Sequence, residues 1–304
     1  MRNLVIAATA VAFTGAAHAA DMPLLKAAPM APPSWTGFYI GINGGGVEGQ
    51  TETGTGVGPG CGPGGAFYAP MGTSSAAPAG LPSQLTCGPA AVNGNIPINI
   101  TNIQAAGSNT INTSGGMFGG QFGYLLQAGS IVGGIEVGFD WMGVKGSANN
   151  GNNYTTLNES GPGVAARLAF NGVPYAFNQS VSSDWLFTFL GRVGFDLGAW
   201  YPYATVGLAV SELKYSNNFS DAIGGVSGFA VTAVKPGIAA GGGIEWRWDN
   251  HWSLRGEYLY IEFSDINGFA NVSGPASPPG SFTQLTQKAT FSQNIGRAAL
   301  SYKF

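Results

Sequence analysis

The last fifteen residues, Thr290 to Phe304, constrain the fold more than any other stretch of the chain. Residues of two kinds alternate along this stretch. The first series is apolar or small and the second is polar: Gly296, Ala298, Leu300, Tyr302 and Phe304 against Gln293, Arg297, Ser301 and Lys303. A period of two residues predicts a β-strand with different faces. One face of this strand is apolar, and the other carries two cations.

The direction of the apolar face separates two fold classes. A soluble sandwich turns it inward, whereas a transmembrane β-barrel turns it outward to lipid and keeps polar groups inside. Only 9% of the residues are charged, against roughly 25% in a typical soluble domain. Low charge with 50 glycines is also typical of a low-complexity chain, but 12% aromatic residues argue against disorder. The net charge of −3, without a basic block, gives no electrostatic footprint for nucleic-acid binding.

The N-terminus has the pattern of a secretory signal peptide. Arg2 precedes a mostly apolar run from Leu4 to Phe13, and Ala17-His18-Ala19 matches a cleavage site. We therefore expect residues 1–19 to be removed on export. A membrane anchor is the alternative, but the apolar run is too short to span a bilayer, and no later run predicts a transmembrane helix. Residues 20–34 are rich in Pro and Ala and predict a flexible periplasmic segment, with a docking peptide as the alternative.

The same alternation recurs along the chain and predicts eight strands. They cover residues 35–45, 116–126, 131–141, 185–195, 201–211, 235–248, 252–263 and 290–304. Long polar intervals, predicted as loops, alternate with short turns; the long ones are 46–113, 142–184, 212–234 and 264–289. This order is typical of an all-β, antiparallel, up-and-down transmembrane barrel with long extracellular loops and periplasmic termini. The barrel domain is predicted to cover residues 35–304. Six aromatic residues are predicted to form a belt at its periplasmic rim: Trp200, Trp246, Trp248, Trp252, Tyr302 and Phe304.

The charged residues of the strand centres all fall on the predicted inner face. They are four acids and four bases: Glu136, Asp140, Glu245, Glu257, Arg192, Arg247, Arg255 and Arg297. A lipid-facing Arg or Lys at mid-depth would cost about 2–4 kcal/mol, so this frame is the favourable one. We predict a charge network in the lumen, with Glu257 paired to Arg297 and Glu245 paired to Arg255. Lumen-filling salt bridges are the first interpretation of these pairs, and a selectivity filter is the second.

Both cysteines, Cys61 and Cys87, lie in the first long interval. Because the chain is predicted to be exported, we expect them to form a disulfide, worth about 3 kcal/mol for a loop of this length. Metal binding is the alternative, but two thiols with no nearby His make a poor site. No metal or other cofactor is predicted.

Several motifs together resemble a known family. They are WTGFYIGINGG (35–45), GGQFGYLLQ (119–127), IVGGIEVGFDW (131–141), GRVGFDLG (191–198), AGGGIEW (240–246), NHWSLRGEYLYIEF (250–263) and IGRAALSYKF (295–304). In order and spacing they resemble the small eight-stranded barrels of alphaproteobacteria, porin-family proteins or outer-membrane surface antigens. These are similar in fold to the transmembrane domain of outer membrane protein A. The first long interval exceeds the length expected for the family, and its cysteine pair is not a family feature.

The resemblance implies a bacterial outer-membrane location and contact with outer-membrane lipid and lipopolysaccharide. It also implies that the terminal aromatic residue, Phe304, is part of the signal read by the barrel-assembly machinery. Family members are implicated in membrane integrity and surface antigenicity, and some are proposed to act as pores or to bind haem. The extracellular partner of the loops is not identified by any motif.

The leading functional hypothesis is a structural outer-membrane barrel that displays surface loops and contributes to membrane integrity. A narrow channel for ions or small solutes is the alternative. A wide pore is not expected, because an eight-stranded barrel has an interior that side chains fill. A surface ligand-binding or adhesion protein is a third hypothesis. An enzyme is not predicted: His18 leaves with the signal peptide and His251 lies in a predicted periplasmic turn, so neither supplies a base at the extracellular rim. The same scarcity argues against His-ligated haem. A soluble lipocalin-like barrel would need an apolar interior, and the predicted inner face is polar.

Overall fold

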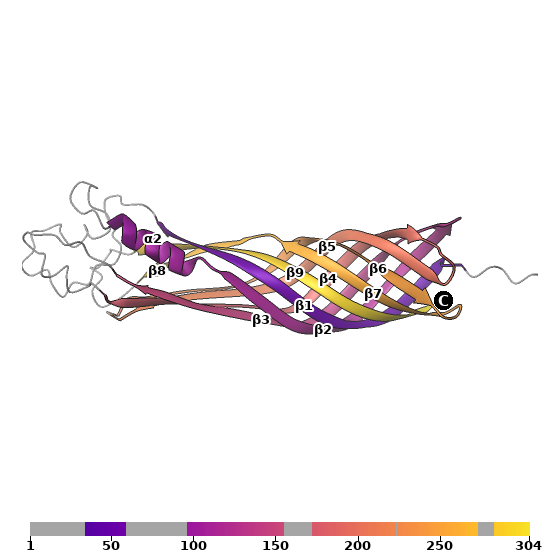
Figure 1. Ribbon diagram of the computed structural model, residues 1–304, viewed down its shortest axis with the longest axis horizontal. Coiled ribbons are helices and arrows are strands. Elements are labelled where there is room, and N and C mark those ends of the chain that lie inside the picture. The colour runs from indigo at the N-terminus through magenta and orange to yellow at the C-terminus, as the bar shows by residue number, and fades with distance from the viewer. Residues whose placement is uncertain (1–33, 59–95, 155–171, 223, 273–282) are drawn as a thin grey trace, which may run out of the picture. The chain divides into compact units, whose positions relative to one another are not determined.

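Long antiparallel strands form one sheet that closes on itself (Figure 1). The computed structural model describes residues 34–58, 96–154, 172–222, 224–272 and 283–304. The predicted signal peptide, Cys61 and Cys87 lie outside these residues. Within the described ranges, nine strands follow in order: β1 Gly37–Gly58, β2 Thr110–Ala128, β3 Ile131–Asn153, β4 Pro174–Phe195, β5 Trp200–Asp221, β6 Val226–Arg247, β7 Trp252–Phe263, β8 Ile266–Val272 and β9 Thr283–Lys303.

Eight strands make the ring, because β8 continues the line of β7. Each strand from β1 to β7 pairs with the next, β7 pairs with β9, and β9 pairs with β1 to close the ring. β8 pairs with the first residues of β9, Thr283 to Ala289, and β7 pairs with the later residues, Ser292 to Tyr302. The predicted eight-stranded antiparallel barrel is therefore confirmed. No helix of the described residues is long and apolar enough to cross a membrane.

The strands extend much further than predicted, so parts of the four long intervals are not loops. β1 continues to Gly58, β3 to Asn153 and β5 to Asp221, while β9 already begins at Thr283. The first interval also contains a helix, α2 Ile96–Gly107, which lies at the end of the barrel away from the C-terminus (Figure 1). The loop prediction for these segments was wrong because the strands there are rich in Gly, Ser and Asn. These residues are depleted in ordinary strands or favour turns.

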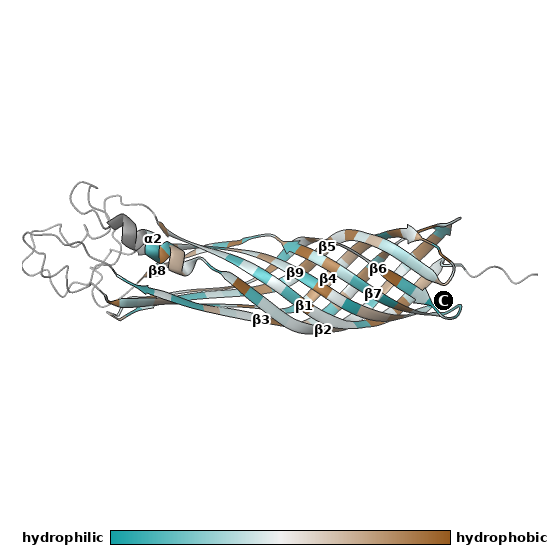
Figure 2. Ribbon diagram, viewed as in Figure 1, coloured by the Kyte–Doolittle hydropathy of each residue, from teal (hydrophilic) through white to brown (hydrophobic). Residues whose placement is uncertain are grey.

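The faces of the sheet exchange polarity along the strands. In the half that holds the short turns, apolar side chains such as Phe38, Ile135 and Val206 point outward and are exposed. In the other half, β5 turns Leu213 inward and Lys214 outward. Figure 2 shows hydrophilic and hydrophobic positions alternating along the strands. The sheet thus has a lipid-compatible half and a half with the polarity of a water-soluble protein.

Two rows of aromatic side chains border the apolar outer band. The lower belt consists of the six predicted residues, and their rings form a continuous row with neighbouring centroids 5.1–6.3 Å apart. The upper belt was not predicted. It consists of Phe118, Phe139, Trp141 and Trp185, with centroids 5.1–6.2 Å apart. Trp141 of the upper belt lies ten residues after Ile131, the first residue of β3 next to a short turn, and for a tilted strand this length corresponds to a band roughly 25 Å tall.

Side chains fill the barrel in the half away from the short turns. We call the main group the upper apolar cluster: Val47, Ile111, Met117, Met142, Val144, Val181, Leu186, Leu190, Ala209, Leu213, Tyr215, Ala239, Leu259, Ile261, Phe263, Ile266, Ala289, Phe291 and Ile295. Above it, Gln179 donates to Tyr215, and Asn217 donates to Gln287 at 2.6 Å, which forms a buried polar layer. The α2 residue Ile103 is fully buried in a further apolar group that includes Phe177 and Leu285. Transverse layers of side chains therefore occupy the interior.

Candidate functional site

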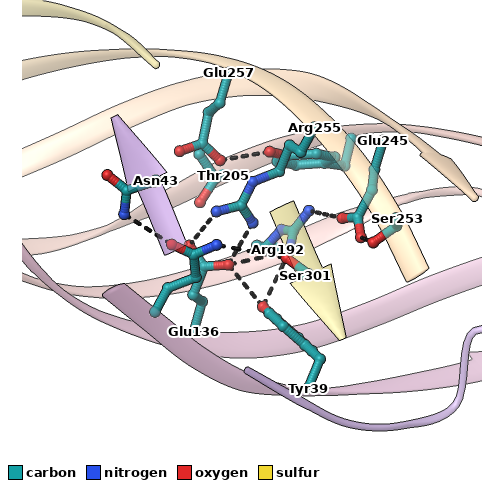
Figure 3. A network of polar contacts seen from close by, with 12 residues as sticks. Tyr39, Asn43, Glu136, Arg192, Thr205, Glu245, Ser253, Arg255, Glu257 and Ser301 are labelled. Atoms are coloured by element: carbon teal, nitrogen blue, oxygen red, sulfur yellow. Dashed lines mark hydrogen bonds and ion pairs between the residues drawn. The ribbon is translucent and has the colours of Figure 1, made fainter. Parts of the chain in front are cut away.

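The predicted inner-face charges meet around one carboxylate, Glu136 of β3, which is fully buried (Figure 3). Three guanidinium groups from different strands donate to it. Arg192 of β4 lies at 3.2 Å, Arg297 of β9 lies at 3.2 Å, and Arg255 of β7 donates to both oxygens. The Tyr39 hydroxyl of β1 adds a fourth donor at 2.7 Å. Glu136 therefore connects side chains from across the whole lumen. It ties its neighbour β4 and the three non-adjacent strands β1, β7 and β9 into one unit.

Two further carboxylates extend the network outward from this centre. Glu245 accepts from Arg192 at 2.9 Å and from the Ser253 hydroxyl at 2.5 Å. Glu257 accepts from Arg297 Nε at 2.6 Å and from the Tyr203 hydroxyl at 2.5 Å. Each of these acids thus shares an arginine with Glu136. Such shared, charge-assisted bonds offset the high desolvation cost of burying ions.

The sheet register explains one predicted pair and corrects the other. Glu257 lies directly opposite Arg297, and their side chains form the predicted ion pair. Glu245 also lies directly opposite Arg255, but their side chains do not pair. The Arg255 side chain reaches across the lumen to Glu136 instead. The prediction of a Glu245–Arg255 pair was wrong because a long side chain in a narrow barrel reaches partners beyond the adjacent strand.

Two of the eight predicted residues have looser or different surroundings. Asp140 lies at 3.5 Å from Arg297, at the margin of the network. Arg247 is located near the short turns, where it donates to the Gly198 carbonyl at 2.9 Å and its guanidinium lies 4.4 Å from the Trp35 ring centroid. The structure thus brings seven of the predicted residues together and places Arg247 apart from them. Four carboxylates then surround three guanidinium groups: Glu136, Asp140, Glu245 and Glu257 around Arg192, Arg255 and Arg297.

Tyr39, Tyr203 and Ser253 complete the network but were not among the predicted site residues. All three lie on the inner face by strand parity, so alternation alone could have indicated them. Inner glycines make room for both tyrosines. A Cβ atom on Gly123 would lie 2.5 Å from the Tyr39 hydroxyl oxygen, and one on Gly243 would lie 2.7 Å from that of Tyr203. Glycine at these two positions therefore permits a hydroxyl donor to reach each carboxylate.

A tryptophan closes the lumen below the network. Trp35 is only 3% exposed, although it precedes the first strand. Its indole nitrogen donates to Asp196 at 3.0 Å, and its backbone nitrogen donates to Gln127 at 2.8 Å. Its ring packs 5.2 Å from the Tyr201 ring. The charge network therefore lies between the Trp35 plug on one side and the upper apolar cluster on the other.

The sequence of this barrel matches one protein family. The family model of the outer membrane protein beta-barrel domain matches residues 65–304. The chain is a member of this family. The protein is therefore an outer-membrane β-barrel, with its short turns on the periplasmic side and its long connections outside. The apolar outer band is the lipid-facing surface.

Similar proteins are known from Brucella and Rhizobium. The 31 kDa outer-membrane immunogenic protein of Brucella melitensis biotype 1 is 27% identical over the full length of both chains. The 22 kDa outer membrane protein of Rhizobium leguminosarum bv. viciae is 30% identical over 48% of this chain and 53% of that protein. Both relatives are named as outer-membrane proteins, in agreement with the family match.

Two solved outer-membrane proteins are similar at a lower sequence identity. The outer membrane protein OprG from Pseudomonas aeruginosa is 14% identical, with 88% of this chain and 96% of that chain covered and a TM-score of 0.32. The outer membrane protease OmpT from Escherichia coli is 9% identical, with 90% and 97% covered and a TM-score of 0.40. Among the described residues of this chain, no group of three or more His, Cys, Asp and Glu side chains is arranged to hold a metal ion.

Proposed function

We propose that the protein is a structural outer-membrane barrel that displays a folded surface region and contributes to membrane integrity. The observation that carries the proposal is the filled lumen. The Trp35 plug, the Glu136 network and the upper apolar cluster succeed one another along the barrel axis. A continuous aqueous path would have to cross all three layers. The proposed role is therefore mechanical and does not involve transport through the lumen.

The surface half of the barrel supports the display part of the proposal. Its strands continue beyond the upper belt with an apolar interior, and α2 packs at the outer end through Ile103. The polar outer face of these strands is the surface that other molecules meet. A relative is named an immunogenic outer-membrane protein, and this arrangement provides a rigid platform for such recognition.

The proposal includes partners on both sides of the membrane. The outer band is proposed to contact outer-membrane lipid and lipopolysaccharide. Phe304 is proposed to be recognised by the barrel-assembly machinery. Its ring is exposed beside Tyr302, while its backbone nitrogen donates to Phe38 at 3.0 Å. The barrel-closing position of the residue and the exposure of its ring are both compatible with that role.

A narrow, gated channel is the second candidate, and the charge network is the observation that favours it. Arginines and acids in the middle of a pore act as selectivity elements in other channels. Planar-bilayer recording of the refolded full chain tests both candidates. We expect insertion without sustained conductance steps. Reproducible unitary steps that depend on salt would favour the channel over the structural role.

A further inference from the structure

Exposed charges of both signs lie on the outer face just beyond the upper aromatic belt, and their balance differs around the barrel. On β1 and β7 the exposed positions carry three acids, Glu48, Glu52 and Glu262, while β9 carries one exposed cation, Lys288, which pairs with Asp265. On β3 and β5 the same outer face carries Lys145 and Lys214, and the acids Asp184 and Glu212 pair with Lys214. The headgroups of the outer leaflet lie at this level, so anionic headgroups meet a favourable side and an unfavourable side.

The two lysines belong to an ordered row of outward-facing residues. The register places Ser114 opposite Lys145, Lys145 opposite Ser182, and Ser182 opposite Lys214. At one end of the row, Glu48 of β1 lies opposite Ser114. Adjacent strands lie about 4.8 Å apart, so both serine hydroxyls are within reach of a group bound at the Lys145 ammonium. An ammonium group flanked by two hydroxyl groups can donate hydrogen bonds to several oxygens of one phosphate.

The two lysines differ in their partners. Lys214 forms ion pairs with Asp184 and, at 3.3 Å, with Glu212. Hydrogen bonds from Lys214 to these carboxylates raise its pKa, and its charge is already compensated. Lys145 makes no ion pair or hydrogen bond with any residue that the structure describes. Its charge is therefore the one in the row that remains for a ligand.

An aromatic platform lies on the membrane side of Lys145. Trp141 precedes Lys145 on β3, and its ring stacks on that of Phe118 at 5.4 Å. Four residues of tilted strand place the Lys145 backbone about 10 Å beyond that of Trp141, within the headgroup region. The side chain is long enough to extend toward the platform. A molecule with a phosphorylated headgroup and acyl chains would contact both features.

We propose that Lys145, Ser114 and Ser182 bind a phosphate of the outer-leaflet glycolipid, with its acyl region against Phe118 and Trp141. The ligand is the phosphorylated disaccharide headgroup of lipopolysaccharide. This site rests on the proposed lipid contact and assigns it to one side of the barrel. The exposed acids of β1 and β7, Glu48, Glu52 and Glu262, are expected not to hold the phosphate, so the ligand should lie on the β3 and β4 side of Ser114.

The test uses the full chain refolded in phosphatidylcholine vesicles with and without diphosphoryl lipid A. Lipid A retained by the protein is measured by native mass spectrometry after detergent extraction. One lysine near an anionic surface contributes about 1 kcal/mol, so Lys145→Gln should weaken retention about fivefold. Lys145→Glu should weaken it further. The matched control is Lys288→Gln, which removes an exposed lysine that pairs with Asp265 and should leave retention unchanged.

Three further arms separate the outcomes. Dephosphorylated lipid A should be retained equally by wild type and Lys145→Gln, whereas excess inorganic phosphate should compete only weakly. Equal retention of diphosphoryl lipid A by wild type and Lys145→Glu would overturn the site, as would an equal loss in Lys288→Gln. Strong competition by inorganic phosphate would show that the ligand of the site is a free anion and not the glycolipid.

Heat-modifiable migration in cold SDS reports the closed barrel independently. A barrel that fails this assay contradicts the proposed function, whereas a loss of lipid selectivity alone contradicts only the site.

Discussion

Glu257 and Arg297 face each other directly on β7 and β9, and Arg297 Nε donates to Glu257 Oε1 at 2.6 Å. The same guanidinium also reaches Glu136 at 3.2 Å. The pair is thus one arm of a larger network in which Arg297 has three anionic partners, Glu257, Glu136 and, at 3.5 Å, Asp140. Because both residues are buried, removing either one leaves a charge without its closest partner.

A double-mutant cycle on this pair should therefore show coupling. Glu257→Gln or Arg297→Gln alone is expected to lower the free energy of unfolding, and the double variant should recover part of the loss. Interaction energies between contacting residues are roughly 0.5–3 kcal/mol. Urea unfolding of the refolded barrel measures all four proteins. Strictly additive losses would show that the two side chains do not interact.

Glu136→Gln should be more damaging than any substitution at the outer acids of the network. Three arginines and Tyr39 donate to this carboxylate, so neutralising it leaves several buried cations undercompensated. Breaking a buried ion pair costs about 3–5 kcal/mol. The control is Glu262→Gln on the exposed outer face of β7, expected within about 0.5 kcal/mol of wild type. Similar unfolding midpoints for the two variants would contradict the central role of Glu136.

Trp35→Ala should open the periplasmic mouth and destabilise the barrel. The substitution removes a buried ring and the hydrogen bond from its indole nitrogen to Asp196, and truncation of a buried Trp costs about 3–5 kcal/mol. Trp248→Ala, in the exposed lower belt, is the matched control and should cost less. Conductance should stay absent in Trp35→Ala, because the upper apolar cluster still blocks the lumen. A conducting Trp35→Ala barrel would identify the tryptophan as the sole barrier.

Leu213 and Lys214 test the exchanged polarity of the outer half. Leu213 is buried in the upper apolar cluster, whereas Lys214 lies on the outer face. Leu213→Asn should lower the free energy of unfolding by about 2–5 kcal/mol, because it creates a cavity and buries a polar group. Lys214→Asn should change it by less than about 1 kcal/mol. Equal, small effects at both positions would mean that this segment is a loop after all.

The Cys61–Cys87 disulfide stays a prediction from export, since both residues lie outside the described ranges. It should form within one chain, because an exported loop passes through an oxidising compartment. Peptide mapping under non-reducing conditions should recover one cross-linked fragment that contains both cysteines. Free thiols or a link between two chains would reject the assignment.

The sequence allowed the ring of strands and the inner face to be predicted, because both depend only on period two. Each of the eight charges was placed on the correct face by parity alone. The Glu257–Arg297 pair followed from strand adjacency. The partners of Arg255 did not, because its side chain crosses the lumen to Glu136, and contacts across a barrel depend on curvature and shear rather than on alternation.

The strand extensions escaped prediction for a different reason. An alternation of apolar residues outside and polar residues inside marks a lipid-facing strand, and it holds only within the lipid band. Beyond it, the alternating pair Leu213 and Tyr215 points inward. If apolar residues are expected only on the lipid-facing side, a segment with apolar residues inside and polar residues outside is indistinguishable from a polar loop. The continuation of β5 beyond Ser211 is visible in the sequence only as alternation in which the apolar residues point inward.

The exchange of polarity along the strands also sets how deeply the molecule is immersed. A displacement of the barrel outward by two residues of strand, the period of its alternation, would lift Phe118 and Trp141 into water. The same displacement inward would draw Lys145 and Lys214 toward hydrocarbon. Either displacement carries an energetic penalty. The pattern of apolar and charged residues along the strands therefore sets the depth of the barrel in the membrane. No anchor or partner is needed to fix that depth.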